Sequence, residues 1–160
     1  MTHKFFSKPY MDNRQIILVR RGEGKRVRTI GDFVGKRIGT QAGSNSEDYI
    51  NDDVRLKNSF AEFKTYRTFK DAFAELEAGE VDALIVDELA ARYELTNIPP
   101  KFDIVEDTIG PITQIAIAFP KDNTKLRDRV QKVFDEMIAD GTARKISEHW
   151  FKADLIKRVK

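Results

Sequence analysis

The chain has 160 residues, a formal net charge of +2 and no cysteine. This length suffices for one ordinary domain whose core needs neither a disulfide nor a metal. The absence of cysteine excludes thiolate zinc sites, and the only two histidines, His3 and His149, lie at opposite ends of the chain. The 28 basic and 26 acidic residues nearly balance, so the electrostatic footprint of a nucleic-acid-binding protein is missing. We therefore expect no metal, no cofactor and no nucleic-acid partner.

The apolar segments are short. The segment QIAIAF, residues 114–119, is typical of them and is far too short to cross a bilayer. Residues 1–20 lack the apolar core of a signal peptide. The sequence itself thus predicts neither a transmembrane helix nor a signal peptide in this chain.

Strand and helix patterns alternate along the first half of the chain. Residues 14–21 predict a strand, a short helical turn follows around residues 30–35, and residues 36–41 predict a second strand. A helix is expected from Ser44 to about Lys57, and a third strand over residues 62–66.

The alternation continues in the second half. Thr68 is expected to cap a helix that Gly79 ends, and residues 81–87 form the most hydrophobic predicted strand. The remaining predicted elements are a helix over 88–97 and strands over 102–107 and 113–119. Strands separated by helices of this length favour an α/β fold with a mostly parallel sheet and helices on both faces.

The predicted helix after the second strand begins with Ser44 and Glu47, three positions apart. One interpretation is a capping box, in which Ser44 caps the amide of Glu47 and the Glu47 carboxylate reaches back to the amide of Ser44. The other is an anion site, because unpaired N–H groups and the positive end of the helix dipole face whatever lies beyond the turn. This stretch by itself leaves both open.

Asp87 ends the most hydrophobic strand, beside a predicted helix start, and is either another helix cap or a ligand-binding carboxylate. Ligands of such sheets bind at the carboxyl ends of the strands, and Asp87 shares that edge with the loop before the helix of Ser44. A positive helix start and a carboxylate at one edge are together complementary to a zwitterion. A carboxylate would dock on the amides and hydroxyls of Ser44, Asn45 and Ser46, and an ammonium would donate to Asp87. Gln41 could reach the ligand's side chain.

Other apparent motifs are weaker. GDFVGKR, residues 31–37, resembles a phosphate loop, but its glycines are one residue too close and it precedes a strand. The adjacent acids Asp87 and Glu88 could be imagined as a general acid and base, yet neighbours on one element rarely converge on a substrate. We expect no catalytic residues.

Four consecutive segments resemble the polar amino-acid-binding proteins of ABC importers, the family 3 type of periplasmic binding proteins. They are FSKPYMDNRQIILVRRG, IGDFVGKRIGTQAGSNSE, YRTFKDAFAELEAGEVDALIVDE and IAIAFPKDNTKLRDRVQKVFDEMIADGTARKISEHWF. The resemblance implies a type II periplasmic-binding-protein fold, in which two lobes close on one amino acid. It implies that the turn at Ser44 and Asn45, with Ser46 beside them, holds the ligand carboxylate. Asp87 would hold the amino group, and Gln41 matches a position that often touches the ligand side chain.

The resemblance also implies how the chain divides. Residues 1–120 correspond to the second lobe with its hinge strands, and residues 121–160 to helices that in the family pack on the first lobe. The first lobe, with the Arg of a T-x-x-R segment that clamps the carboxylate, has no counterpart before FSKPY. We therefore expect a truncated protein, with residues 14–20 and 114–119 as neighbouring strands leading to the former hinge.

The resemblance implies the extracytoplasmic solute-binding component of an amino-acid ABC importer. Its partners would be a polar amino acid and a membrane permease, and its location the periplasm or the cell surface. A micromolar binder has roughly −8 kcal/mol to share between two lobes, so one lobe would bind at about millimolar or worse. The alternatives are a small-carboxylate dehydratase, with Asp87 or Glu88 as acid or base, and a sensor or interaction module.

An apolar stripe at helical spacing marks the C-terminal region. It comprises Leu126, Val130, Val133, Phe134, Met137 and Ile138, extended by Ile146, Trp150 and Phe151. A bare stripe of this kind rarely persists on a monomer. We expect a homodimer, as a symmetric pair or with an exchanged element, with Phe134, Met137 and Trp150 in its interface. Folding of the stripe onto its own lobe is the competing outcome.

Overall fold

The structure is a computed structural model that describes residues 4–157. In this part of the chain, residues 14–112 form one compact unit, and residues 4–13 with 113–157 form another. We call them the sheet unit and the terminal unit. The bounds of these two units differ from the expected bounds of 1–120 and 121–160. The assignment of those two ranges to a ligand-binding lobe and a helical tail stays a prediction.

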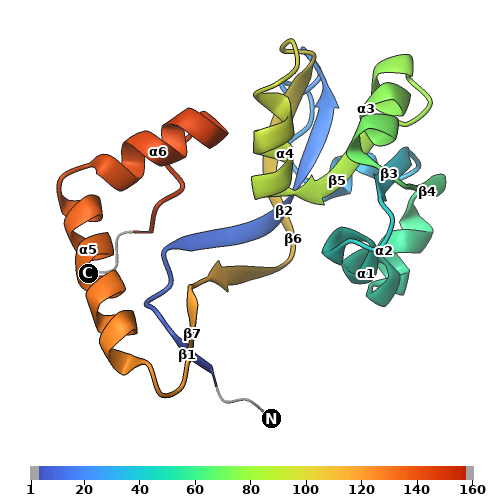
Figure 1. Cartoon of the computed structure of the whole chain (residues 1–160). Helices are drawn as coiled ribbons and strands as arrows, with labels where there is room; N and C mark the ends of the chain where they lie inside the picture. Colours follow the sequence, from blue (N-terminus) through green and yellow to red (C-terminus); the bar gives the residue numbers. More distant parts are fainter. Residues whose placement is uncertain (1–3, 158–160) are drawn as a thin grey trace. The chain divides into compact units, whose positions relative to one another are not determined.

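The sheet unit is built on a five-stranded sheet with the order β4-β3-β5-β2-β6 (Figure 1). In chain order its strands are β2 (Met11–Arg20), β3 (Arg37–Gln41), β4 (Glu62–Tyr66), β5 (Ala83–Asp87) and β6 (Phe102–Ile115). Strand β3 pairs in parallel with both β4 and β5, whereas β2 runs antiparallel to β5. The predicted α/β fold is confirmed, with a mixed sheet.

Helices cover both faces of this sheet because its central strands are apolar on both sides. Along β2, Ile17 and Val19 enter one core, and Ile16 and Leu18 enter the other. The 3-10 helix η1 (Ile30–Phe33) and the helices α1 (Asn45–Asp52) and α2 (Val54–Ser59) pack on the first face, which we call the α1 face. Helices α3 (Phe69–Ala78) and α4 (Glu88–Leu95) pack on the other, the α3 face.

Two predicted elements differ from the structure. The single helix expected from Ser44 to Lys57 breaks at Asp53, because the Asp53 carboxylate accepts a hydrogen bond from the amide of Leu56 at 2.9 Å and caps α2 as a separate helix. The two strands expected over 102–107 and 113–119 are largely one strand, β6. Gly110 lets β6 continue with a φ of +72°, and β6 lies at a sheet edge, where the following proline is tolerated.

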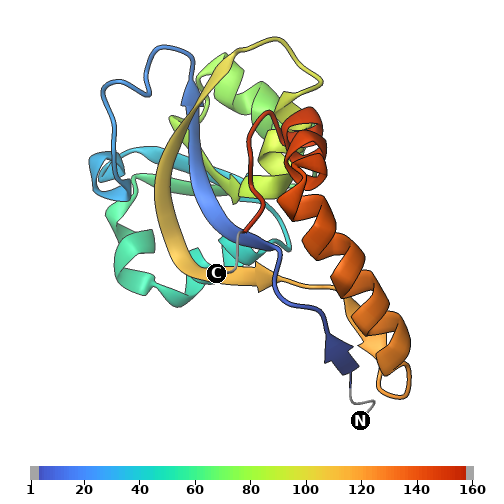
Figure 2. The ribbon, with the colours of Figure 1, turned by 90° about the vertical axis from the view of Figure 1, so that its left-hand side faces the viewer.

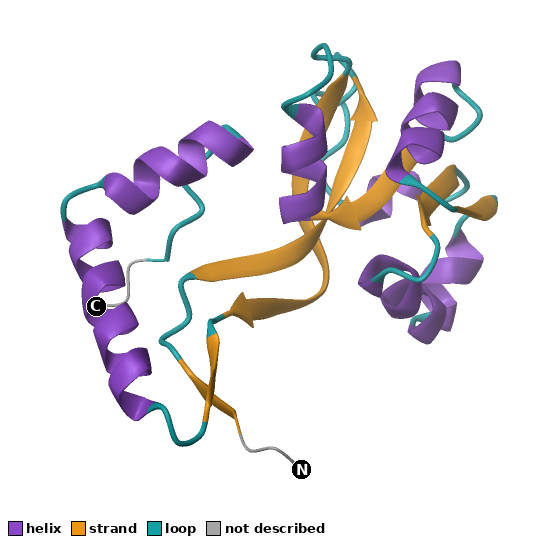
Figure 3. Ribbon diagram, viewed as in Figure 1, coloured by secondary structure: helices purple, strands orange, loops and turns teal. Residues whose placement is uncertain are grey.

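The terminal unit contains a small antiparallel pair and two helices (Figures 2 and 3). Strand β1 (Lys4–Phe6) pairs with β7 (Ala118–Pro120), and the helices are α5 (Thr124–Ala139) and α6 (Thr142–Phe151). The ring of Tyr10 meets that of Phe134 edge to face, with 5.2 Å between the ring centroids. This contact attaches α5 to the segment that precedes β2.

Strands β2 and β6 are neighbours, as expected for the two predicted strands that lead to the hinge. The register differs from the expectation, because residues 115–120 lie opposite residues 4–10 and not opposite 14–20. The amide of Tyr10 donates to the carbonyl of Ile115 at 2.9 Å, and Lys4 pairs with Pro120.

Candidate functional site

The five predicted site residues lie at one edge of the sheet. Gln41 is the last residue of β3 and Asp87 the last residue of β5, and these two strands are parallel. Helix α1, which contains Asn45 and Ser46, begins after the turn that follows β3 and packs against both strands. The structure therefore brings the N-terminus of α1 and the Asp87 carboxylate to the same carboxyl edge.

Ser44 caps α1. Its Oγ accepts a hydrogen bond from the amide of Glu47 at 3.3 Å and donates to the carbonyl of Gln41 at 2.6 Å. The capping box was also expected to join the Glu47 carboxylate to the amide of Ser44, and this is wrong. The Glu47 carboxylate instead accepts a hydrogen bond from the amide of Gly43 at 2.6 Å. Gly43 has a φ of +69°, and this turn conformation presents its amide to the helix start in place of that of Ser44.

The two amides that follow the cap differ in access. Within residues 4–157 neither the Asn45 nor the Ser46 backbone N–H has an acceptor, but Asn45 is exposed whereas Ser46 is fully buried. Such N–H groups at the first turn carry the positive end of the helix dipole and favour an anion. The two interpretations of this helix start are thus compatible: Ser44 serves as the cap, and the exposed amide of Asn45 is positioned to meet an anion.

Asp87 also caps a helix, which is one of the two roles predicted for it from the sequence. Its Oδ1 accepts a hydrogen bond from the amide of Ala90 at 3.0 Å, at the start of α4. A carboxylate offers about four lone-pair sites, so capping and binding an ammonium do not exclude each other.

Strand alternation places Asp87 on the α1 face. Ile85 and Ala83, two and four positions earlier in β5, belong to the core on that face, and successive side chains of a strand point to opposite faces. Gln41 lies two positions after Gly39 and so projects to the same face as that residue. This is the α3 face, because Gly39 lies against Leu84, which belongs to the core on that face. Gln41 is therefore at the right edge but on the α3 face, whereas Asp87 and α1 share the α1 face.

Sequence reasoning missed Gln15, which is only 3% exposed and lies directly opposite Asp87 in the β2–β5 pair. Its Oε1 accepts a hydrogen bond from the hydroxyl of Ser46. A polar residue at the start of the apolar run IILV was the one available signal. That signal could not identify its partners, since the register of β2 against β5 is not readable from the sequence.

Glu88, the other acid considered for catalysis, has a structural role. It is 4% exposed and lies between two guanidinium groups, with Arg14 Nε at 2.7 Å from Oε2 and Arg92 Nε at 2.8 Å from Oε1. Burial acts to raise the pKa of Glu88, but the hydrogen bonds from Arg14 and Arg92 outweigh it, so the pKa lies below its ordinary value. Exposed Glu106 completes the network, at 3.0 Å from Arg92 and 3.5 Å from Arg14. A carboxylate held ionised in this way is a poor general base at neutral pH.

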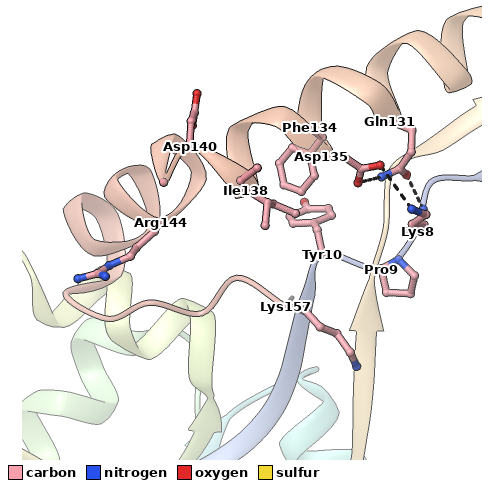
Figure 4. A pocket seen from close by; sticks show the side chains of 12 residues that line it. Lys8, Pro9, Tyr10, Gln131, Phe134, Asp135, Ile138, Asp140, Arg144 and Lys157 are labelled. Atoms are coloured by element: carbon pink, nitrogen blue, oxygen red, sulfur yellow. Dashed lines mark hydrogen bonds and ion pairs between the residues drawn. The ribbon is translucent and has the colours of Figure 1, made fainter. Parts of the chain in front are cut away.

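The terminal unit contains a separate pocket of about 560 Å³ (Figure 4). Tyr10, Phe134 and Ile138 form its apolar wall, and Lys8 and Gln131 are joined at one end by a hydrogen bond of 2.8 Å from the Lys8 amide. None of the predicted site residues lines this pocket.

Within residues 4–157, no group of three or more His, Asp or Glu side chains could hold a metal ion. No helix in that range is long and apolar enough to cross a membrane.

Comparison with known proteins gives consistent matches. The L-cystine-binding protein TcyJ of Escherichia coli K12 is 29% identical over 152 residues, which are 95% of this chain and 55% of that protein. ABC transporter arginine-binding protein 1 of the same strain is 30% identical over 151 residues, covering 91% of this chain and 58% of that protein. The chain thus spans somewhat more than half the length of these relatives.

Solved structures agree. A polar amino acid ABC uptake transporter substrate binding protein from Streptococcus thermophilus has a TM-score of 0.84 and 26% identity, covering 96% of this chain and 59% of that one. An ABC uptake transporter substrate binding protein from Streptococcus pneumoniae with bound histidine has a TM-score of 0.66 and 29% identity, covering 97% and 64%. The family model of the bacterial extracellular solute-binding proteins, family 3, matches residues 3–153. The chain therefore belongs to the bacterial extracellular solute-binding proteins, family 3.

Proposed function

We propose that this chain contributes one side of the ligand site of an amino-acid-binding protein that serves an ABC importer. The observation that carries the proposal is the placement of the α1 N-terminus and of Asp87 at one sheet edge and on one face. The ligand's carboxylate docks at the first turn of α1, on the exposed amide of Asn45, and its ammonium donates to Asp87. The hydroxyls of Ser44 and Ser46 already donate to Gln41 and Gln15, so they hold this turn in place beneath the ligand. The relatives' names, which specify cystine, arginine and histidine, support an amino acid as the ligand.

Gln41 lies at the same sheet edge but on the α3 face, so we propose that it contacts only a ligand side chain long enough to reach over the end of β3. Gln41 is half-buried at the end of β3, and its carbonyl already accepts from Ser44. An amide at this position favours a polar side chain, which supports the class of polar amino acids over apolar ones.

The contacts named above limit the affinity. A micromolar site has about −8 kcal/mol in total, and half of that corresponds to a dissociation constant of about 1 mM. We therefore propose millimolar or weaker binding for the chain by itself. The binding assay must work in this range, so we choose NMR titration of the 15N-labelled chain with L-arginine, L-histidine and L-cystine.

The decisive variant is Asp87→Asn, with Asp53→Asn as its matched control. Each residue caps a helix through its carboxylate, to Ala90 in one case and to Leu56 in the other, and asparagine caps about as well as aspartate. Both variants remove one negative charge. A hydrogen bond to a charged group contributes about 1.5 to 3 kcal/mol, so Asp87→Asn is expected to weaken binding about 10- to 100-fold.

The control variant is expected to leave the dissociation constant unchanged. Equal affinities for Asp87→Asn and the unmodified chain would contradict the role of Asp87. Chemical shift changes confined to the terminal unit, with none at the first turn of α1, would place the ligand elsewhere and defeat the proposed site.

The importer role adds a membrane permease as partner and the periplasm or the cell surface as location. Both follow from the family, whose members are extracellular solute-binding proteins. Catalysis by a dehydratase-like site has less support, because Glu88, one of the two acids considered for it, is committed to two arginines.

We also propose a homodimer through the apolar stripe of the terminal unit. Leu126, Val133, Ile146 and Trp150 are each 44–50% exposed. A groove of about 340 Å³ runs along α5, lined by Leu126, Arg129, Val130, Val133, Phe134 and Met137. Phe134 already packs on Tyr10 within the chain, so α5 has an intramolecular contact as well as an exposed apolar side.

Light scattering at high micromolar concentration tests the dimer. Val133→Asp is expected to produce a monomer, because it places a charge in the groove, whereas Lys132→Asp on the neighbouring exposed position is expected to leave the dimer intact. A monomeric unmodified chain would refute the proposal.

A further inference from the structure

Gln15 is a buried polar residue at the candidate site to which no role has been given. It lies in β2, opposite Asp87, in a register that continues with Ile16 opposite Val86. Residues directly opposite in an antiparallel pair project to the same face, with Cβ atoms about 4.5–5.5 Å apart. Gln15 and Asp87 are therefore side by side on the α1 face.

The side chain of Gln15 reaches from the strand to the helix. The hydroxyl of Ser46 donates to Gln15 Oε1, and Ser46 is the second residue of α1. Both residues are almost completely buried, at 3% and 0% exposed. A hydrogen bond between two buried side chains is shielded from competition with water, and removing one partner leaves the other unsatisfied.

We propose that Gln15 is a positioning residue that sets the N-terminus of α1 relative to Asp87. Gln15 acts on the anion-binding amides through Ser46, and on the ammonium-binding carboxylate through its place beside Asp87 on the neighbouring strand. The two ends of a zwitterion are thereby held at a fixed separation. The inference rests on the proposed function for its ligand, but the link between β2 and α1 is a property of the chain without ligand.

A first experiment tests this link without any ligand. Hydrogen exchange is measured for the α1 amides of the unmodified chain, Gln15→Met, Ser46→Ala and their double variant. Each single variant is expected to speed exchange of the hydrogen-bonded amides of Glu47 and Asp48, in the first turn of α1, about tenfold relative to the rest of the sheet unit. Because one shared contact is lost in each case, the double variant is expected to add little more.

The matched control is Ser147→Ala. Ser147 is also buried, at 2% exposed, and its hydroxyl donates to the carbonyl of Ala153 at 2.8 Å and accepts from the amide of Leu155 at 2.9 Å. These bonds lie within the terminal unit, so the first turn of α1 is expected to exchange as it does in the unmodified chain. A uniform change in Gln15→Met, or additive effects of Gln15→Met and Ser46→Ala, would overturn the proposed link.

A second experiment tests whether the link matters for binding. The chain and Gln15→Met are titrated with L-arginine and L-histidine, and with the decarboxylated amines agmatine and histamine. If Gln15 positions the carboxylate-binding amides relative to Asp87, Gln15→Met weakens binding of the amino acid about tenfold and changes binding of the corresponding amine little. An equal loss for both ligand types would show a general structural defect and refute the positioning role.

The two experiments separate the two proposals. If the unmodified chain binds neither amino acid, the proposed function fails, and hydrogen exchange still decides whether Gln15 fixes α1. If exchange in α1 depends on Gln15 while amino-acid affinity does not, Gln15 is a structural tie only, and the positioning role is wrong.

Discussion

Replacement of Glu88 by glutamine is expected to destabilise the sheet unit strongly. The Glu88 carboxylate is nearly buried and accepts hydrogen bonds from Arg14 and Arg92. Removing one partner of a buried ion pair costs about 3–5 kcal/mol because the other charges stay buried without compensation. Both arginines retain Glu106, so we expect the low end of this range, about 3 kcal/mol.

Urea denaturation followed by circular dichroism measures this loss. With a slope of about 2 kcal/mol per molar urea, 3 kcal/mol corresponds to a midpoint lowered by about 1.5 M. The matched control is Glu106→Gln, which removes the 61% exposed carboxylate of the same network and is expected to cost about 0–1 kcal/mol. A loss below about 1 kcal/mol for Glu88→Gln, or equal losses for the two variants, would refute the reasoning.

The same variant has a pH signature. The pKa of Glu88 in the folded chain lies below its ordinary value of 4.5, so the folded state binds the proton less tightly than the unfolded state. The stability from Glu88 is therefore complete above pH 4.5 and is lost as the pH falls through the folded pKa. The difference between the unmodified chain and Glu88→Gln should accordingly shrink below pH 4.5.

Three further outcomes are expected. Gly39→Ala should cost about 1–3 kcal/mol in urea denaturation, because its Cβ would lie 2.8 Å from atoms of both Leu84 and Tyr66; a neutral result would contradict this packing. Gly79→Ala should cost about 1–2 kcal/mol by the same assay, because Gly79 ends α3 with a φ of +80°, and a stabilised variant would show that the left-handed cap is absent. Burial, followed by the charge of Glu75, raises the pKa of Tyr66 to about 12. In an ultraviolet titration the phenol of Tyr66 should ionise late, near its raised pKa of about 12, and Tyr66→Phe should remove this transition. Stability should fall as the pH rises from about 10 to about 12.

Local signals predicted the elements that depend on local chemistry. Thr68 caps α3 by accepting from the amide of Asp71 at 3.1 Å, and Gly79 ends the same helix, so both bounds were readable from residue types. Asp53 carries an equally local capping signal, but the helical pattern on both sides of it predicts one continuous helix. The break expected between the strands over 102–107 and 113–119 is absent for a different reason. A glycine such as Gly110 can end a strand or bend it, and only the pairing of β6 with its neighbour decides between the two.

The residues of the candidate site likewise differ in whether local sequence signals were enough to predict them. Ser44 and Asp87 were found because each stands at the end of a strand and the start of a helix, which is visible in the sequence. Their common edge follows from the parallel pairing of β3 and β5. Their common face requires more, since it depends on strand alternation counted from buried residues, and this count moves Gln41 to the opposite face.

The role of Gln15 is the hardest to predict from the sequence. Its position beside Asp87 follows from the antiparallel register of two strands about 70 residues apart in sequence. A shift of this register by one residue would turn Gln15 toward the α3 face and would break its bond to Ser46. The buried apolar residues that follow Gln15 in β2 fix the register, since a slip would exchange the members of the two cores. The geometry of a polar site is thus set by apolar packing on both sides of the sheet, and a variant that repacks β2 should change ligand affinity without touching any ligand-binding residue.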